Sequence, residues 1–234
     1  MTPVSLATLA PAVVALGLMI LIVASGLDFQ LADLLYGWQG GAWSLRHDFL
    51  VSKILHARAQ KRSTAIELST VVLALVSPYH PRLRRWRRGL AYVALTGLAG
   101  LAVVSLGKHL LPLACPSQLE RYGGWLPNRL WLGRDLVALG KGCFPSAHAS
   151  GGFALCGWYF YARYYGLSGA GRYAAAALAA GAVLGFAQQI RGAHFLSHDL
   201  AAVAVCWAAA WLLARVWLVA VPAPRPVAAA SAMA

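Results

Sequence analysis

Long apolar segments recur along the whole chain and restrict its fold more than any other feature. A helix needs roughly 17 to 25 predominantly apolar residues to cross about 30 Å of hydrocarbon. Six segments fit this range: Ser5–Gly26, Ser63–Tyr79, Leu90–Leu111, Ala147–Tyr165, Tyr173–Ile190 and Leu200–Val221. A hydrophobic content of 60% and a mean hydropathy of +0.63 are also unusual for a soluble protein. We therefore expect an all-α, polytopic membrane protein, a bundle of six transmembrane helices.

The order of the segments indicates a single domain over residues 1–221, because no internal repeat and no second type of composition interrupts it. The first segment carries no charge, and no Lys or Arg precedes Arg46. An uncleaved helix fits this pattern better than a signal peptide, which would begin with positive charge. The second segment contains Glu67, so its boundaries are the least well defined. The tail Pro222–Ala234 is rich in Pro and Ala and is expected to be disordered.

The loop His80–Gly89 determines the expected orientation. It contains five arginines: Arg82, Arg84, Arg85, Arg87 and Arg88. The positive-inside rule places so basic a short loop in the cytoplasm. Both chain ends would then be cytoplasmic, while Pro112–Ser146 and Arg191–Asp199 would face outward. We expect a protein of the bacterial inner membrane with its site facing the periplasm.

One segment departs from this rule. Leu27–Arg62 would lie outside, although it contains several basic residues: Arg46, Lys53, Arg58, Lys61 and Arg62. Long loops count for less in the rule, and the segment could instead lie along anionic head groups as an amphipathic helix. The net charge of +13 would suggest nucleic acid in a soluble protein. Beside membrane helices it favours anionic lipids as partners and not nucleic acid.

Residues with catalytic potential are concentrated in the two outward segments. Because successive helices alternate in direction, the end of the third apolar segment, the start of the fourth and the junction of the fifth and sixth should meet on one face. The residues concerned are Lys108, Ser146, Ala147, His148, Arg191, His194, His198 and Asp199. We expect them to form one site.

This set of residues suits a phosphate group. Ser146 occupies an N-cap position, and free N–H groups at a helix N-terminus bind anions. Lys108 and Arg191 add positive charge, with Arg191 offering the donor fork that suits phosphate oxygens. His148 and His194 supply a nucleophile and an acid whose pKa lies near neutrality. The combination predicts phosphoryl transfer.

At these residues the chain resembles the type 2 phosphatidic acid phosphatase (PAP2) superfamily. The family pattern is Lys, six residues, Arg-Pro; then Pro-Ser-Gly-His; then Arg, five residues, His, three residues, Asp. The matching residues, all between 108 and 199, are Lys108, Pro116, Pro145, Ser146, His148 and His194. The resemblance implies a six-helix fold and a reaction without metal or cofactor. It also implies that His194 forms a phosphohistidine, that His148 protonates the leaving oxygen, and that Lys108 and Ser146 hold the phosphate.

Four positions depart from the family pattern. They are Cys115 in place of Arg, Ala147 in place of Gly, Gln188 in place of Arg, and His198 in place of Asp. Arg191 is the nearest substitute by charge for the third-motif Arg, so the expected substrate-binding residues are Lys108, Ser146, Ala147 and Arg191. We expect Asp199 to orient His194 by accepting from its ring N–H, with His198 as the alternative. Asp199 could also be a helix N-cap.

The four cysteines fall into two pairs by location. Cys156 and Cys206 lie inside apolar segments, whereas Cys115 and Cys143 lie in the outer loop. The outer pair is either a disulfide, which would close a loop of about thirty residues in an oxidising compartment, or two free thiols. No common zinc site has these Cys and His spacings, so we expect no metal.

The sequence predicts a membrane enzyme that hydrolyses a phosphate monoester or diphosphate of a lipid. Phosphatidic acid, phosphatidylglycerophosphate, undecaprenyl diphosphate and lipid A all suit the site. A phosphotransferase would use the same residues with a lipid acceptor in place of water. A non-catalytic protein that binds or transports an anion or lipid is the alternative from another class, although a transporter should hold its charges near the bilayer midplane and not at helix ends.

Overall fold

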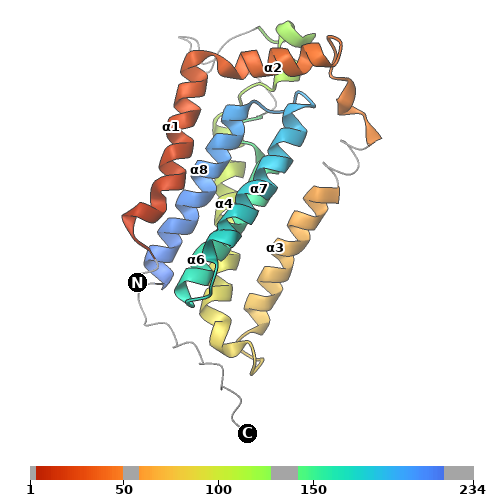
Figure 1. Ribbon diagram of the computed structural model, residues 1–234. Coiled ribbons are helices and arrows are strands. Elements are labelled where there is room, and N and C mark those ends of the chain that lie inside the picture. Colours follow the sequence, from red (N-terminus) through yellow and green to blue (C-terminus); the bar gives the residue numbers. More distant parts are fainter. Residues whose placement is uncertain (1–3, 50–57, 128–141, 219–234) are drawn as a thin grey trace.

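The computed structural model describes residues 4–49, 58–127 and 142–218. Within them the regular secondary structure is helical apart from one isolated bridge between Leu119 and Leu126. Most helices run side by side in a bundle, and α2 crosses one end of it (Figure 1). The helices are α1 (Ala10–Ser25), α2 (Leu27–Trp38), α3 (Ala59–Val76), α4 (Arg87–Leu110), α5 (Ala147–Phe153), α6 (Gly157–Tyr164), α7 (Ala170–Gln189) and α8 (Leu196–Leu213). The predicted all-α fold is confirmed. The tail Pro222–Ala234 lies outside the described residues.

Four helical segments of the described residues are long and apolar enough to cross a membrane. They are Leu6–Ser25, Arg84–Leu110, Ala170–Gln189 and Leu196–Leu218. They correspond to the first, third, fifth and sixth predicted spans and indicate a membrane protein. The second predicted span coincides with α3, whose first half is polar and which carries Glu67. The fourth predicted span is helical but interrupted, so the count of six spans stays a prediction.

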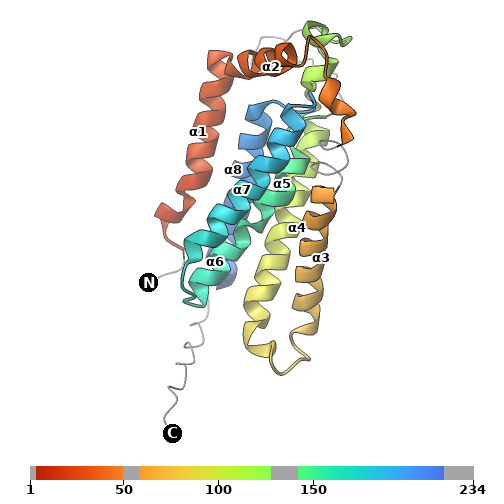
Figure 2. The same cartoon turned by 45° about the vertical axis from the view of Figure 1, so that its right-hand side comes forward.

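The interruption in the fourth span is a 3-10 turn, Ala154–Cys156, between α5 and α6. Glycine is a weak helix former, and Gly152 lies just before this turn. A Cβ added at Gly152 would collide with the backbone of α7 at Gly181, and one at Gly181 would collide with the ring of Phe153. Helices α5 and α7 therefore pack backbone to backbone, as small residues allow in membrane bundles, and Figure 2 shows them side by side.

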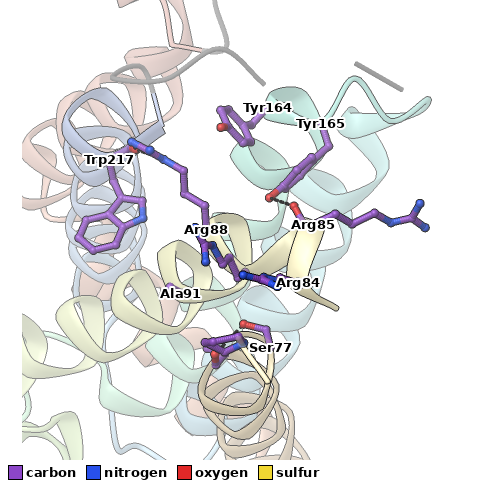
Figure 3. Close-up of a pocket in the computed structure, with 11 residues that line it drawn as sticks. Ser77, Arg84, Arg85, Arg88, Ala91, Tyr164, Tyr165 and Trp217 are labelled. Atoms are coloured by element: carbon purple, nitrogen blue, oxygen red, sulfur yellow. Dashed lines mark hydrogen bonds between the residues drawn. The ribbon is translucent and has the colours of Figure 1, made fainter. Parts of the chain in front are cut away.

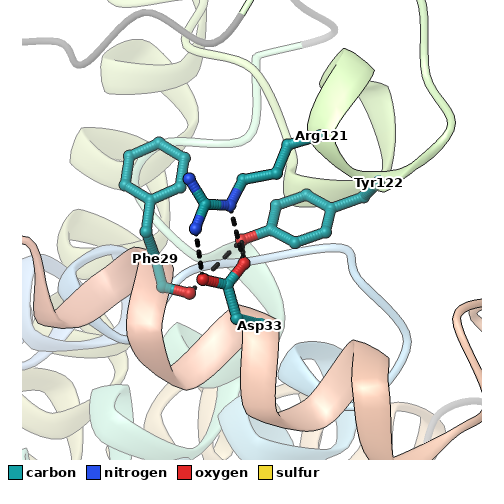
Figure 4. A network of polar contacts seen from close by, with 4 residues as sticks. All are labelled: Phe29, Asp33, Arg121 and Tyr122. Atoms are coloured by element: carbon teal, nitrogen blue, oxygen red, sulfur yellow. Dashed lines mark hydrogen bonds and ion pairs between the residues drawn. The ribbon is translucent and has the colours of Figure 1, made fainter.

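Helix α2, which crosses one end of the bundle, contacts the loop that follows α4. Its Asp33 forms an ion pair with Arg121 and accepts a hydrogen bond from the Tyr122 hydroxyl at 3.0 Å (Figure 4). The same hydroxyl lies 3.3 Å from the carbonyl oxygen of Phe29. These contacts fasten the loop after α4 onto α2. Residues 50–57 lie outside the description, so the expected path of Leu27–Arg62 is described only in part.

The core of the bundle forms where α4, α6 and α8 meet. Tyr92 of α4 is fully buried, and its hydroxyl donates to the carbonyl oxygen of Ala210 at 2.8 Å. The rings of Phe160 and Trp207 are 5.9 Å apart, and the Trp207 indole donates to the Thr8 carbonyl oxygen at 2.8 Å, which ties the start of α1 to α8. Large apolar side chains are exposed on α1 and α3, as expected for surfaces that face lipid: Val13, Leu16, Ile20, Leu21, Leu68, Val72 and Leu75.

Candidate active site

The expected site residues come from helix ends at the end of the bundle that α2 crosses. Lys108 lies in the last turn of α4, and Ser146 immediately precedes α5. His194 lies in the short connection between α7 and α8. A small cavity between α2 and this connection is lined by residues of both, including Asp28 and His194. The fold therefore brings residues far apart in the sequence to one place.

Ser146 begins α5 and is completely buried. Its hydroxyl oxygen accepts a hydrogen bond from the Ala149 N–H at 3.4 Å, the N-cap arrangement expected from the sequence. Its own N–H donates to the carbonyl oxygen of His198 at 3.0 Å. This second bond attaches the start of α5 to the first turn of α8. It fixes the position of Ser146 relative to the histidines.

Lys108 is held against the segment that leads into α5. Its ammonium donates to the Gly142 carbonyl oxygen at 2.8 Å. Gly142 has a φ of +69°, and an added Cβ would lie 2.7 Å from the Lys108 carbonyl oxygen, so only glycine suits this close approach. A disulfide joins Cys115 to Cys143 with a Cα–Cα distance of 5.3 Å. The Cys143 N–H also donates to the Leu113 carbonyl oxygen at 2.8 Å. Three contacts therefore connect the end of α4 and the residues just after it to the segment that leads into α5.

Three histidine rings are neighbours. The ring centroids of His148 and His194 are 6.4 Å apart, and those of His194 and His198 are 5.7 Å apart. The Nδ1 atoms of His194 and His198 are 3.4 Å apart. The distance from His148 to His194 is about twice a hydrogen-bond length, so one phosphate between the rings could contact both. His194 is buried, whereas His148 is partly exposed.

The surroundings of His194 favour its neutral form. Burial, and then the neighbouring His198, Lys108 and His148, lowers the pKa of this ring well below the usual 6.5. The Cys143 backbone acts in the opposite direction but is the weakest influence. A neutral imidazole keeps a lone pair on one ring nitrogen, which a nucleophile needs. The lowered pKa of His194 therefore favours the protonation state that a nucleophile at this position would need.

Asp199 does not make the contact expected from the sequence. Its Oδ2 accepts a hydrogen bond from the Gln189 side chain at 2.7 Å, and its carboxylate lies against Gly185 of α7. Successive residues of a helix point about 100° apart, so Asp199 faces α7 while its predecessor His198 faces His194. Among the described contacts, His198 and not Asp199 is the partner of the His194 ring.

Arg191 is held near the site without touching either histidine in the described contacts. Its Nη1 donates to the Gln188 side-chain oxygen at 2.9 Å. Gln188, which occupies the position of the family Arg, therefore helps to hold the Arg191 guanidinium in place. Burial, and then the positive charge of Arg46, lowers the pKa of Arg191. From the sequence, Arg46 is one of the basic residues of Leu27–Arg62 and is not predicted to lie near the site, because the path of that segment cannot be inferred.

Asp28 is a second residue that the sequence analysis missed. It is buried at the start of α2, and its Oδ1 accepts a hydrogen bond from the Ser197 N–H at 3.0 Å. It thereby caps α8, whose own N-cap residue Phe195 makes no side-chain bond. Burial raises the pKa of Asp28, and the Ser197 hydrogen bonds partly offset this. The available signal was that Asp28 is the first charged residue after an uncharged apolar segment.

Comparison with known proteins identifies one family. A family model described as the PAP2 superfamily matches residues 88–221 and includes every residue of the site from Lys108 to Asp199. No curated protein and no solved structure shows significant similarity to the chain. The match covers more than half of the chain, from the start of α4 to beyond the end of α8.

Proposed function

The chain belongs to the PAP2 superfamily, whose members are generally phosphatase-type hydrolases acting on phosphate esters, and we propose that it removes phosphate from a membrane lipid. The observation that carries the proposal is the pair of histidine rings, His148 and His194, 6.4 Å apart beside Lys108. The four apolar spans support a substrate that is itself part of the membrane. Phosphate monoesters and diphosphates of lipids are the proposed class, with phosphatidic acid, phosphatidylglycerophosphate, undecaprenyl diphosphate and lipid A as candidates.

In the first step a ring nitrogen of His194 attacks phosphorus, forming an N–P bond as the P–O bond to the lipid breaks. His148 donates a proton to the departing oxygen, which leaves as the lipid alcohol or the shortened phosphate. Lys108 and Ser146, with the Ala147 backbone and Arg191, bind the phosphoryl oxygens and stabilise their charge. In the second step His148 removes a proton from water, whose oxygen attacks phosphorus and releases His194. No metal takes part.

His198 is the proposed orienting residue for His194. If Nδ1 of His194 carries the proton, that N–H can donate to Nδ1 of His198, and the lone pair at Nε2 of His194 then faces the phosphate. Unlike a carboxylate, a neutral imidazole supplies no negative charge to the phosphohistidine. Asp199 contributes indirectly, because its carboxylate accepts the hydrogen bond that fixes the Gln189 side chain at the end of α7.

The proposed topology has six spans and both chain ends in the cytoplasm. The interrupted helix from α5 to α6 and the polar-ended helix α3 would be the two further spans. The arginine-rich start of α4 and the site at the far end of the same helix support a cytoplasmic arginine loop and a periplasmic site. The disulfide between Cys115 and Cys143 supports an oxidising compartment on the side of the site.

Phosphate release tests this proposal. The purified protein in detergent should release phosphate from at least one lipid phosphate of a panel with EDTA present, and His194→Ala should abolish the release. His109→Ala is the matched control, because His109 is exposed and lies one residue from Lys108. Equal turnover by wild type and His194→Ala would exclude the mechanism. Phosphate that appears on an added lipid alcohol instead of in water would favour the phosphotransferase.

A further inference from the structure

A pocket of about 440 Å³ lies at the opposite end of α4 from the histidines (Figure 3). Its volume is within the range of about 300–1,000 Å³ that ligand sites occupy. The start of α4 lines it, together with the ends of α3 and α6 and the helical segment Ala214–Leu218 that follows α8. Arg87 in the first turn of α4 and Lys108 in its last turn are 21 residues, or about 32 Å, apart. The pocket is therefore separate from the candidate active site.

Four arginines line this pocket: Arg84, Arg85, Arg87 and Arg88. Residues three and four apart share one face of a helix, so Arg84, Arg87 and Arg88 converge on the same side. The first turn of α4 contains no acidic residue, and the positive end of the helix dipole adds to the charge of the arginines. The positive charges repel one another in the pocket, and a bound anion would relieve this electrostatic repulsion.

Among the described residues, no Asp or Glu lines this pocket beside the arginines. The sequence has no Asp or Glu between Glu67 and Glu120, and none after Asp199. The Glu67 side chain lies against Gly97, which is ten residues, or about 15 Å, further along α4 than Arg87. The ion pair between Arg121 and Asp33 lies at the other end of the bundle. The described residues therefore supply no counter-ion for the pocket, and an anion from outside the protein can take that place.

The walls of the pocket are fixed by hydrogen bonds. Arg88 reaches from α4 towards Trp217 and donates to its carbonyl oxygen from Nε, at 2.8 Å, and from Nη2 (Figure 3). The Tyr165 hydroxyl donates to the Arg85 carbonyl oxygen at 3.3 Å and accepts from the Gly89 N–H at 3.2 Å. Trp and Tyr are the side chains typical of the membrane–water interface, so the pocket has the composition of a head-group site.

We propose that this pocket binds the phosphate of an anionic phospholipid from the membrane leaflet on its own side, as a site distinct from the catalytic one. Basic pockets between transmembrane helices bind phospholipid head groups in this way. Arg84 and Arg87 contact the phosphate oxygens through their donor forks. The bound lipid neutralises the start of α4 and fills the space between α4 and the neighbouring helix ends.

Lipid binding measured by native mass spectrometry tests the proposal. Wild type in neutral detergent is titrated with phosphatidylglycerol, whose phosphate is a diester, and in parallel with zwitterionic phosphatidylcholine. Arg84→Gln/Arg87→Gln should weaken phosphatidylglycerol binding roughly 25-fold, since each Arg near an anionic head group contributes roughly a fivefold effect. Arg84→Lys/Arg87→Lys, which keeps the charge but loses the fork, should be intermediate.

The matched control is Arg82→Gln/Arg172→Gln. It removes the same charge from the same end of the molecule, at residues that do not line the pocket. Binding that is retained in this control and lost in the pocket variant supports the site. Equal loss in both variants, no loss in either, or equal affinity for phosphatidylcholine overturns it. Displacement of the lipid by millimolar inorganic phosphate overturns the lipid as the source of the phosphate. The measurement requires no turnover, so its result is independent of the proposed phosphatase activity.

Discussion

The two ends of α4 are both positively charged, but they satisfy that charge differently. At the C-terminal end, Lys108 donates to a backbone carbonyl and Arg191, in the adjoining connection, donates to a glutamine side chain. At the N-terminal end, Arg84 and Arg87 line an open pocket in a part of the sequence without Asp or Glu. The first arrangement fixes cations at a site before a ligand arrives, and the second depends on an external anion.

This difference matches two kinds of phosphate binding. Catalysis requires donors that are already in place when charge develops in the transition state, so the site with Lys108 needs the ties that fix its geometry. A head-group site needs only net charge and a pocket at the interface, because the membrane presents the ligand at high local concentration. Mutations should therefore affect chemistry at one end of α4 and lipid occupancy at the other.

The largest effect expected in the active site, short of removing His194, is that of His148→Gln. A general acid contributes about 10²–10⁴-fold to the rate when the leaving oxygen needs a proton. The variant should lose about 10²-fold or more in kcat for a lipid phosphate, whose leaving group is a poor one. For p-nitrophenyl phosphate, whose phenolate leaves without a proton, the loss should be smaller than about tenfold.

The paired substrates separate the acid from a structural role. His109→Gln, at an exposed histidine, should leave both rates unchanged. An equal loss of both rates in His148→Gln would mean that His148 binds the phosphate or supports the fold and does not protonate the leaving group. Lipid binding at the arginine pocket should be the same in both variants.

Local pattern was sufficient to predict much of the fold and of the site. Apolar length predicted the positions of α1, α4, α7 and α8, because burial in lipid requires a helix of that length whatever its partners. The N-cap at Ser146 followed from local sequence as well. The meeting of Lys108 with the segment before Ser146 followed from the alternating direction of the helices.

Other features depend on tertiary contacts that sequence pattern does not specify. The break between α5 and α6 accompanies the close approach of Gly152 to Gly181, two residues in separate helices. Asp28 caps α8 across 169 positions of sequence, so no local motif reveals it. The choice between His198 and Asp199 depends on the rotation of α8 about its own axis, which spacing alone leaves open.

A smaller effect on activity is expected from removing the disulfide near the candidate active site. Cys115 and Cys143 are separated by 28 residues, and closing a loop of this size contributes about 3–4 kcal/mol in the chain-entropy model. Cys115→Ser/Cys143→Ser should lower the free energy of unfolding in detergent by this amount. It should also lower kcat, since the segments that carry Lys108 and Ser146 lose one of the three contacts between them.

Reductant provides the control for that variant. It should lower the Tm of the wild type to that of the double serine variant and leave the variant itself unchanged. Phosphatidylglycerol binding at the arginine pocket, about 32 Å along α4, should stay the same under both conditions. A wild-type Tm that does not respond to complete reduction would contradict the stabilising role of the bond.

The smallest predicted effects have opposite signs at the two ends. Asp33→Asn should lower the free energy of unfolding at pH 7 by at most about 1 kcal/mol, because the side chains of Asp33 and Arg121 are 38% and 45% exposed. Arg84→Gln in lipid-free neutral detergent should raise the free energy of unfolding by about 0.2–0.5 kcal/mol, through reduced repulsion from Arg87 and Arg88.

The two effects should differ in their pH dependence. The hydrogen bond from Arg121 holds the pKa of Asp33 below its usual 3.8, so the contribution of Asp33 to stability is present above pH 4 and lost as the pH falls through the lowered value. Thermal unfolding at pH 7 and in strong acid should therefore show the Asp33 difference disappearing, while the Arg84 difference persists because arginine stays charged. A decrease in stability for Arg84→Gln would mean that the arginines are already neutralised within the protein.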